Sequence, residues 1–257
     1  MSPVLPAPAR SAAATPIIRF EDELAKRDLA TFLGRAGRIE DGAVRIIGGD
    51  GVVSVWVPIL RPQGILDASP TVLGMRSFRA RVEHAAAGDE RGGAFDVTVP
   101  LRGLLDRLAR TGETDAGDER DAASLPVPPD RVLESWASMT PERSGWERVG
   151  AIPTDELVRA AEEGIAAVAE AVPGNLGTLL VERVRTSVWE RELDAVSFDD
   201  AANERGFARP TAGAAYAAYS LGFLSPGRTA TIAQQGRWLL AATERGNVVL
   251  HGVRRPR

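Results

Sequence analysis

The chain has 257 residues, of which 44% are hydrophobic and 26% charged, and its formal net charge is −4. It is therefore long enough to bury a substantial core in one large domain or two small ones. Cysteine is absent, which excludes a disulfide framework and thiolate metal sites and favours a cytoplasmic location.

Side chains that perform covalent or acid–base chemistry are scarce. Lys26 is the only lysine, and the two histidines, His84 and His251, lie far apart without metal-ligand spacing. Each histidine ends a predicted strand, where a hydrogen-bonded structural role is the usual one. We therefore expect a protein that is not an enzyme and that needs no cofactor and no metal.

The first 16 residues contain four prolines among alanines. These prolines interrupt any continuous apolar segment, and no later apolar run reaches the length needed to cross a bilayer. We expect residues 1–16 to be a disordered lead and the chain to have no membrane partner.

The first predicted domain, residues 17–111, opens with an amphipathic helix over Phe20–Ala36. Two β-branched runs follow, Ala43–Ile47 and Val52–Ile59, joined by the glycine-rich Gly48–Gly51. Glycines supply the positive φ angles of a hairpin turn. Because a strand follows them and no helix, they do not form a phosphate-binding loop.

A long loop comes next, over Gln63–Leu73. Functional groups concentrate on ordered loops braced by a sheet, so Arg61, Gln63 and Asp67 form a candidate loop site. It would suit a carboxylate-based hydrolase or transferase. Turn formation by Asp67 is the structural alternative.

Two alternating runs predict further strands, Arg76–His84 and Phe95–Val99, and Pro100 opens a helix with leucines at helical spacing. Strands that follow one another without intervening helices favour antiparallel pairing. The first domain is thus predicted to be a four-stranded antiparallel sheet with flanking helices.

Residues 112–124 are glycine-containing and acidic, which is typical of a solvated linker. Residues 125–196 are predicted to be helical. A short helix is expected over Pro129–Met139, and helices over Thr154–Val172 and Leu176–Glu190 form an antiparallel hairpin.

Residues 197–257 are predicted to form a helix-plus-β-meander module with a basic tail. Helices are expected over Phe198–Arg205 and Ala212–Phe223. Strands are expected over Ala230–Gln234, Arg237–Thr243 and Val248–Val253. With this module the whole chain is assigned to the α+β class.

Charge is distributed unevenly over the second half of the chain. Residues 112–209 carry a net charge of −11, whereas residues 210–257 carry +5. A winged-helix-like module binding nucleic acid would explain the basic end. Its candidate phosphate contacts are Arg228, Arg237, Arg245, Arg254 and Arg255. Against this, Ala212–Phe223 holds no Arg, Asn or Gln that could hydrogen-bond to base edges. Its small side chains favour close packing, as in a core helix.

An indole beside an arginine marks a candidate partner contact at Trp146 and Arg148, since Trp and Arg are enriched at interface hot spots. With ordinary catalysis disfavoured, the leading hypothesis is a cytoplasmic adaptor or chaperone-like module whose partner is another protein. The nucleic-acid-binding regulator and the carboxylate-based enzyme stay open as alternatives.

Overall fold

The computed structural model describes residues 15–62, 70–83, 95–113, 122–171, 178–199 and 207–252. Its strands are β1 (Ile17–Phe20), β2 (Ala43–Gly49), β3 (Val52–Leu60), β4 (Thr71–Glu83), β5 (Phe95–Pro100), β6 (Ser124–Pro126), β7 (Glu147–Pro153), β8 (Ser197–Phe198), β9 (Thr229–Gln235), β10 (Trp238–Thr243) and β11 (Gly246–His251). Its helices are α1 (Glu23–Ala36), α2 (Leu101–Glu113), the 3₁₀ turn η1 (Ser135–Ser138), α4 (Thr154–Ala171), α5 (Thr178–Trp189) and α7 (Ala212–Ser220).

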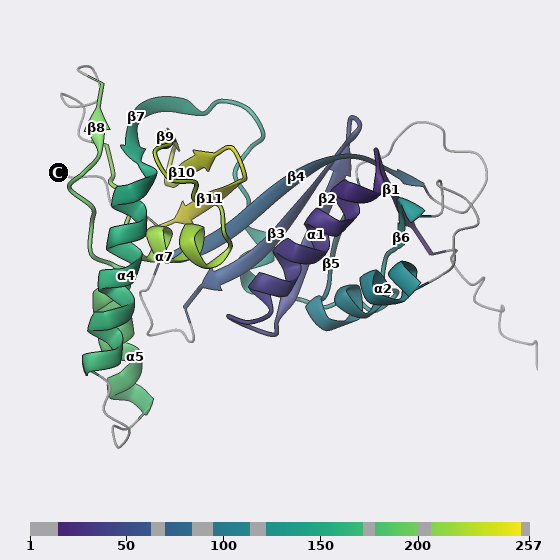
Figure 1. Ribbon diagram of the computed structural model, residues 1–257, viewed down its shortest axis with the longest axis horizontal. Helices are drawn as coiled ribbons and strands as arrows, with labels where there is room; N and C mark the ends of the chain where they lie inside the picture. Colours follow the sequence, from purple (N-terminus) through teal and green to yellow (C-terminus); the bar gives the residue numbers. More distant parts are fainter. Residues whose placement is uncertain are drawn as a thin grey trace, which may run out of the picture.

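These strands form a single antiparallel sheet of 11 strands in the order β5-β2-β3-β4-β11-β10-β9-β7-β8, with β1 paired to β4 and β6 paired to β1 (Figure 1). The expected fold class, an α+β protein with a separate four-stranded sheet and a terminal module, is therefore wrong. The 13-residue β4 joins the two halves, because Thr71 to Met75 pair with β11 while the strand also pairs with β3 and β1.

The predicted hairpin is confirmed. Strands β2 and β3 pair from Arg45 with Trp56 to Gly49 with Val52. Asp50 and Gly51 occupy the turn with φ angles of 55° and 75°, the left-handed conformation that a two-residue hairpin turn requires.

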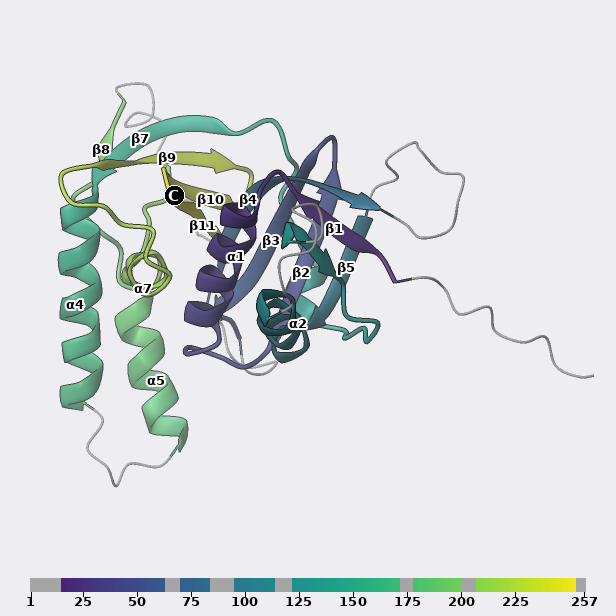
Figure 2. The same cartoon turned by 45° about the vertical axis from the view of Figure 1, so that its right-hand side comes forward.

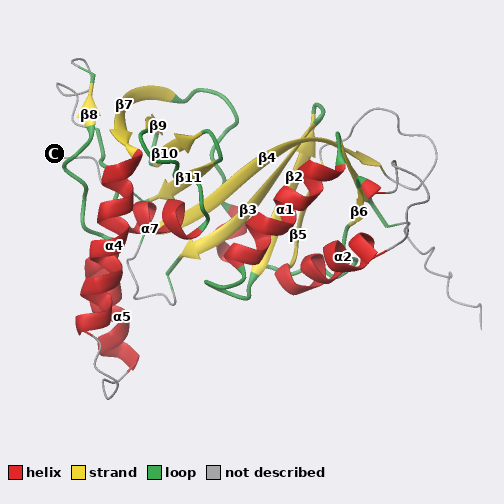
Figure 3. Ribbon diagram, viewed as in Figure 1, coloured by secondary structure: helices red, strands yellow, loops and turns green. Residues whose placement is uncertain are grey.

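Of the described helices, α1, α2, α4 and α7 cover one face of the sheet, whereas η1 lies on the other (Figures 1 and 3). One core cluster contains buried residues of α1, α2, α4 and α7 together with alternate residues of the strands beneath them. Helix α1 begins after Asp22, whose carboxylate accepts a hydrogen bond from the Ala25 N–H at 2.7 Å, as an N-cap does.

Helix α7 lies inside this core, which makes the winged-helix interpretation wrong. Ala214, Ala215 and Ala217 are almost fully buried, so most of the helix surface packs inside the protein and is not available to enter a DNA groove. Glycines in the sheet leave space for the apolar side chains that follow the helix. A Cβ on Gly246 would lie 2.4 Å from the Phe223 ring.

Helices α4 and α5 form the expected antiparallel hairpin, which extends beyond the sheet (Figure 2). Their contact is close because Gly164 leaves room for an aromatic ring. A Cβ at that position would lie 2.4 Å from the Trp189 ring.

The strands β1, β6, β7 and β8 fall where the sequence predicts none. The helix expected over Pro129–Met139 is reduced to η1. The lead over residues 1–16 and the acidic linker over residues 112–124 lie largely outside the described residues, as does the helix expected over Phe198–Arg205. Among the helices that are described, none has the length and apolar character of a membrane span.

Candidate functional site

The face of the sheet opposite the helices carries a second apolar cluster that is rich in tryptophan. Trp56 and Trp136 are buried in it, and Trp146 and Trp238 pack against it from partly buried positions. The chain from residue 127 to residue 146, which connects β6 to β7, supplies Trp136 and Trp146 and covers part of this face. Both faces of the sheet therefore carry apolar clusters, and the residues that the structure describes cover the second face only in part.

Hydrogen bonds spaced along this connecting segment fasten it to the sheet. The Val132 N–H donates to the Thr98 carbonyl at 3.1 Å. The Arg45 guanidinium donates to the Ala137 carbonyl, and the side-chain amide of Gln235 donates to the Ser144 carbonyl. The segment is thus held to the sheet near both of its ends and at its middle.

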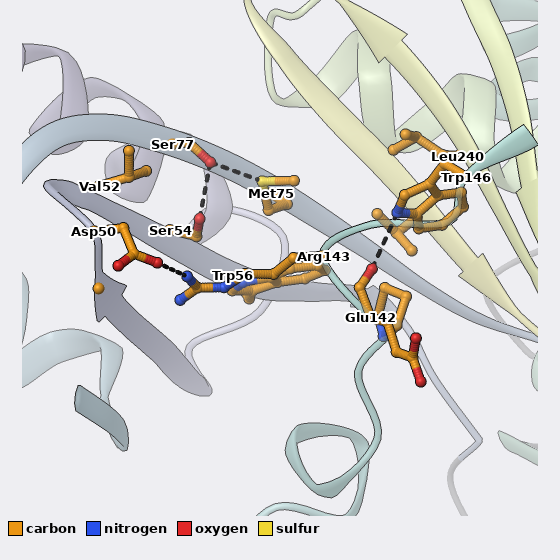
Figure 4. A pocket seen from close by; sticks show the side chains of 13 residues that line it. Asp50, Val52, Ser54, Trp56, Met75, Ser77, Glu142, Arg143, Trp146 and Leu240 are labelled. Atoms are coloured by element: carbon orange, nitrogen blue, oxygen red, sulfur yellow. Dashed lines mark hydrogen bonds and ion pairs between the residues drawn. The ribbon is translucent and has the colours of Figure 1, made fainter. Parts of the chain in front are cut away.

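Between this segment and the sheet lies an open groove of about 330 Å³ (Figure 4). It is lined by Gly49, Asp50, Val52, Ser54, Trp56, Met75, Ser77, Pro141, Glu142, Arg143, Trp146, Leu240 and Val249. Its floor comes from β2, β3, β4, β10 and β11, strands of both halves of the chain, and its wall comes from the end of the connecting segment. We call it the tryptophan groove.

The floor follows from strand alternation. Val52, Ser54 and Trp56 occupy every second position of β3, so all three side chains point to the same face. In the adjacent β4, Met75 lies opposite Trp56 and Ser77 lies opposite Ser54. The two serine hydroxyls are hydrogen-bonded to each other at 2.9 Å.

The wall is shaped by a tight turn before β7. Gly145 has a φ angle of 84°, which favours glycine, and the Trp146 indole N–H donates to the Glu142 carbonyl at 3.2 Å (Figure 4). Arg143 forms an ion pair with Asp50 at 3.3 Å, with the two side chains 61% and 96% exposed. A pair so exposed contributes at most about 1 kcal/mol, so Arg143 is easily released.

Trp56 lies at the inner end of the groove floor with an unsatisfied donor. The residue is 7% exposed, and its indole Nε1 has no hydrogen-bond partner among the described residues. A buried N–H without an acceptor costs about 1–3 kcal/mol. Because Nε1 is itself buried, a ligand oxygen can satisfy this donor only if the atoms that cover it move aside.

The candidate partner contacts Trp146 and Arg148 lie on this face. Trp146 lines the groove. Arg148 pairs with Ala233 of β9, which pairs with Leu240 of β10, which in turn pairs with Val249 of β11. Arg148 is therefore exposed in the same cross-strand row as two residues of the groove floor, although it does not itself line the groove.

The candidate loop site is not assembled in the described part of the chain. Arg61 forms an ion pair with Glu40 and lies 3.9 Å from Glu134, and the hydrogen bond with Glu40 raises its pKa. Arg61 thus links the α1–β2 connection to the segment that carries Glu134. Gln63 and Asp67 lie outside the described residues.

The candidate nucleic-acid contacts do not converge. Arg228 precedes β9 and lies 3.7 Å from Glu244, next to Arg245 in the β10–β11 turn. Arg237 lies in the β9–β10 turn, at the opposite end of these strands. The remaining two, Arg254 and Arg255, fall outside the described residues.

The rare reactive side chains are likewise dispersed. Lys26 lies on the buried face of α1, and burial lowers its pKa. His251 packs against Trp238 in a tilted arrangement, with ring centroids 4.4 Å apart and an interplanar angle of 45°. His84 lies outside the described residues. In the part of the chain that is described, no group of three or more His, Cys, Asp or Glu side chains is placed to hold a metal ion.

Sequence reasoning missed Trp56 and Met75 as groove residues. The signal was present in β3, whose residues are apolar on both faces over Val55–Ile59. Such a run is typical of a strand buried on both sides. Interpreting β3 as part of a sheet that is buried on one face only hid the second cluster.

Two family models match the chain by sequence, and each covers less than half of it. Residues 13–126 match a domain of unknown function, DUF8010, and residues 141–255 match another, DUF8185. No curated protein matches the chain. The boundary between the two matched regions falls within the connecting segment that covers the second face.

Solved structures similar to this chain include DNA polymerase sliding clamps. The clamp of Caulobacter crescentus has a TM-score of 0.48 at 11% identity, over 95% of this chain and 67% of that one. The DNA polymerase III beta subunit of Thermotoga maritima has a TM-score of 0.46 at 13% identity, over 93% and 66%. This chain thus spans about two thirds of the length of those proteins.

Proposed function

We propose that this chain is a non-enzymatic protein-interaction module that binds an extended segment of another protein in the tryptophan groove. The observation that carries the proposal is the open groove itself, whose largely apolar lining includes Trp56, Met75 and Leu240 on a face that the described residues cover only in part. Trp146 forms part of the binding surface as a wall residue, and Arg148 extends that surface along the same face.

The residue types in the groove favour a protein ligand. Trp, Met and Arg are enriched in protein interfaces, and methionine adapts its shape to different partners. Burying one apolar side chain of a partner contributes about 1.5–3 kcal/mol. The groove offers Met75, Leu240 and Val249 as the apolar surface for such a side chain.

A display library of random twelve-residue peptides, selected on the full chain, tests the proposal. Peptides that enrich are expected to bind wild type and to lose at least about tenfold in affinity to Leu240→Glu, because a carboxylate on the floor opposes an apolar side chain. Ile165→Glu is the matched control. Ile165 is an apolar residue of α4 that is 40% exposed, away from the groove, and its substitution should leave the affinity within twofold of wild type.

The donor of Trp56 allows a second comparison. Trp56→Phe keeps an aromatic ring and removes the indole N–H, so a selected peptide should bind about fivefold more weakly, as expected for one lost hydrogen bond. Trp136→Phe removes an equally unpartnered buried indole N–H from the same cluster but outside the groove lining. It should leave the affinity unchanged.

Tryptophan indole ¹⁵N–¹H spectra locate the binding site even if a variant folds poorly. The Trp56 signal should move downfield when a selected peptide is added to wild type, while the Trp189 signal from the opposite face stays in place. The proposal fails if no peptide enriches, or if enriched peptides bind the Leu240→Glu variant as tightly as wild type and leave the Trp56 signal unmoved.

A further inference from the structure

The face that carries the groove continues along β4 as a row of arginines. Side chains of Met75 and Ser77 line the groove, and the next residues on the same face are Arg79 and Arg81. Phe78 and Ala80, between them, are buried in the core on the helix side. The register confirms this placement, because Arg79 lies opposite Val52 of the groove floor.

Both arginines are available to a ligand. Each is exposed, and neither forms an ion pair with a described residue. They differ in this respect from Arg76 on the opposite face, which is paired with Asp28, and from Arg45, which is paired with Asp96.

We propose that the partner segment is acidic: an extended peptide that places an apolar side chain in the tryptophan groove and carboxylates against Arg79 and Arg81. This inference rests on the proposed function and specifies its ligand. Alternate residues of a strand are roughly 7 Å apart, and an extended peptide alongside β4 has the same spacing. Arg79 and Arg81 lie four and six residues beyond Met75 of the groove floor, so the expected ligand pattern is an apolar anchor followed by acidic residues four and six positions away.

The charges around the groove agree with this pattern. Arg143 in the wall adds a third cation when it exchanges its exposed partner Asp50 for a ligand carboxylate. Glu142 does not oppose it, because its carboxylate points away from Trp146 and Ser54 (Figure 4). The arginine row and the apolar groove form one continuous surface, and an acidic peptide matches both parts, whereas a phosphodiester backbone matches only the row.

The peptide library described above tests the inference through the residues that it selects. Enriched peptides should carry Asp or Glu at the two predicted positions. Replacing both with Asn or Gln should weaken binding to wild type by about five- to tenfold, as expected for two exposed ion pairs. The same replacement should change binding to the Arg79→Gln/Arg81→Gln variant by less than twofold.

The control variant is Arg38→Gln/Arg110→Gln, which changes the net charge equally but on exposed residues that follow α1 and end α2. It should retain the preference of wild type for the acidic peptide. Asp50→Asn, which preserves the positive-φ turn because Asn tolerates that conformation, should strengthen binding of the acidic peptide about twofold by releasing Arg143.

The outcomes separate the two proposals. If selected peptides bind the groove without acidic residues and bind both arginine variants equally well, that result contradicts the acidic ligand but not the protein-interaction function. Failure to enrich any groove-dependent peptide overturns both. A fluorescein-labelled single-stranded DNA dodecamer serves as competitor. If it binds Arg79 and Arg81 more tightly than the selected peptide does, the peptide assignment is wrong.

Discussion

At the scale of single residues, His251 shows how the second face constrains a titratable side chain. It ends β11 and packs against the Trp238 ring at a tilt, with ring centroids 4.4 Å apart. Burial, and to a smaller extent the positive charge of Arg237, lowers the pKa of His251 below its ordinary value of 6.5. Folding therefore favours the neutral imidazole.

This residue predicts a pH dependence of stability. The unfolded chain binds the proton more readily, so the contribution of His251 to the free energy of unfolding is complete above pH 6.5 and is lost as the pH falls through the lowered pKa. Urea unfolding at pH 7.5 and pH 5.5 should show a larger loss at low pH for wild type than for His251→Gln, by about 0.5 kcal/mol for a group that stays partly exposed to solvent. Equal losses in the two proteins would show that His251 titrates alike in the folded and unfolded chains.

At the scale of elements, β7 depends on a glycine that lets β8 approach. Gly150 pairs with Phe198 and Ile232. A Cβ at Gly150 would lie 2.5 Å from the Ser197 carbonyl oxygen, closer than real Cβ contacts allow. The same glycine hides the strand in the sequence, because it interrupts a short run that is weakly alternating.

The expected consequence is that Gly150→Ala lowers the free energy of unfolding by about 1–3 kcal/mol, as overpacking does. Gly34→Ala is a matched control in α1, where a Cβ would meet nothing within 4 Å, and it should stabilise the protein by about 0.5–1 kcal/mol. Chemical denaturation of the three proteins gives both values. A neutral Gly150→Ala would mean that β8 does not pair closely with β7 in solution.

At the scale of the whole molecule, the two halves share both a sheet and a core. Phe32 of α1 stacks on Phe223, which follows α7, with ring centroids 5.7 Å apart. The Arg35 guanidinium donates to the Leu221 carbonyl at 2.9 Å. Together with the pairing of β4 and β11, these contacts couple the regions that the two family models match separately.

The halves are therefore expected to unfold as one cooperative unit. Phe223→Ala should cost about 3–5 kcal/mol and should lower hydrogen-exchange protection equally in β2–β3 and in β10–β11, since both lie on the shared core. Tyr219→Ala, at a position in α7 that is 40% exposed, should have little effect in either region. Loss of protection confined to β10–β11 would show that the halves unfold independently.

Local patterns in the sequence determined the elements that local chemistry specifies. The hairpin at Asp50 and Gly51, helix α1 with its Asp22 cap, and the α4–α5 hairpin follow from turn residues, capping and periodicity, which act over a few neighbouring positions. The scarcity of reactive side chains, and Trp146 as a candidate contact, are also readable from the sequence.

Only the tertiary structure decided how β4 pairs with β11, which faces are covered, and that Trp56, Arg143 and Leu240 meet in one groove. Pairing between distant strands depends on contacts that no local pattern encodes. Short strands such as β6 and β8 have too few residues to show alternation and exist because a neighbouring strand supplies their hydrogen bonds. The proposed site belongs to this second class, because its floor and wall come from segments far apart in the chain.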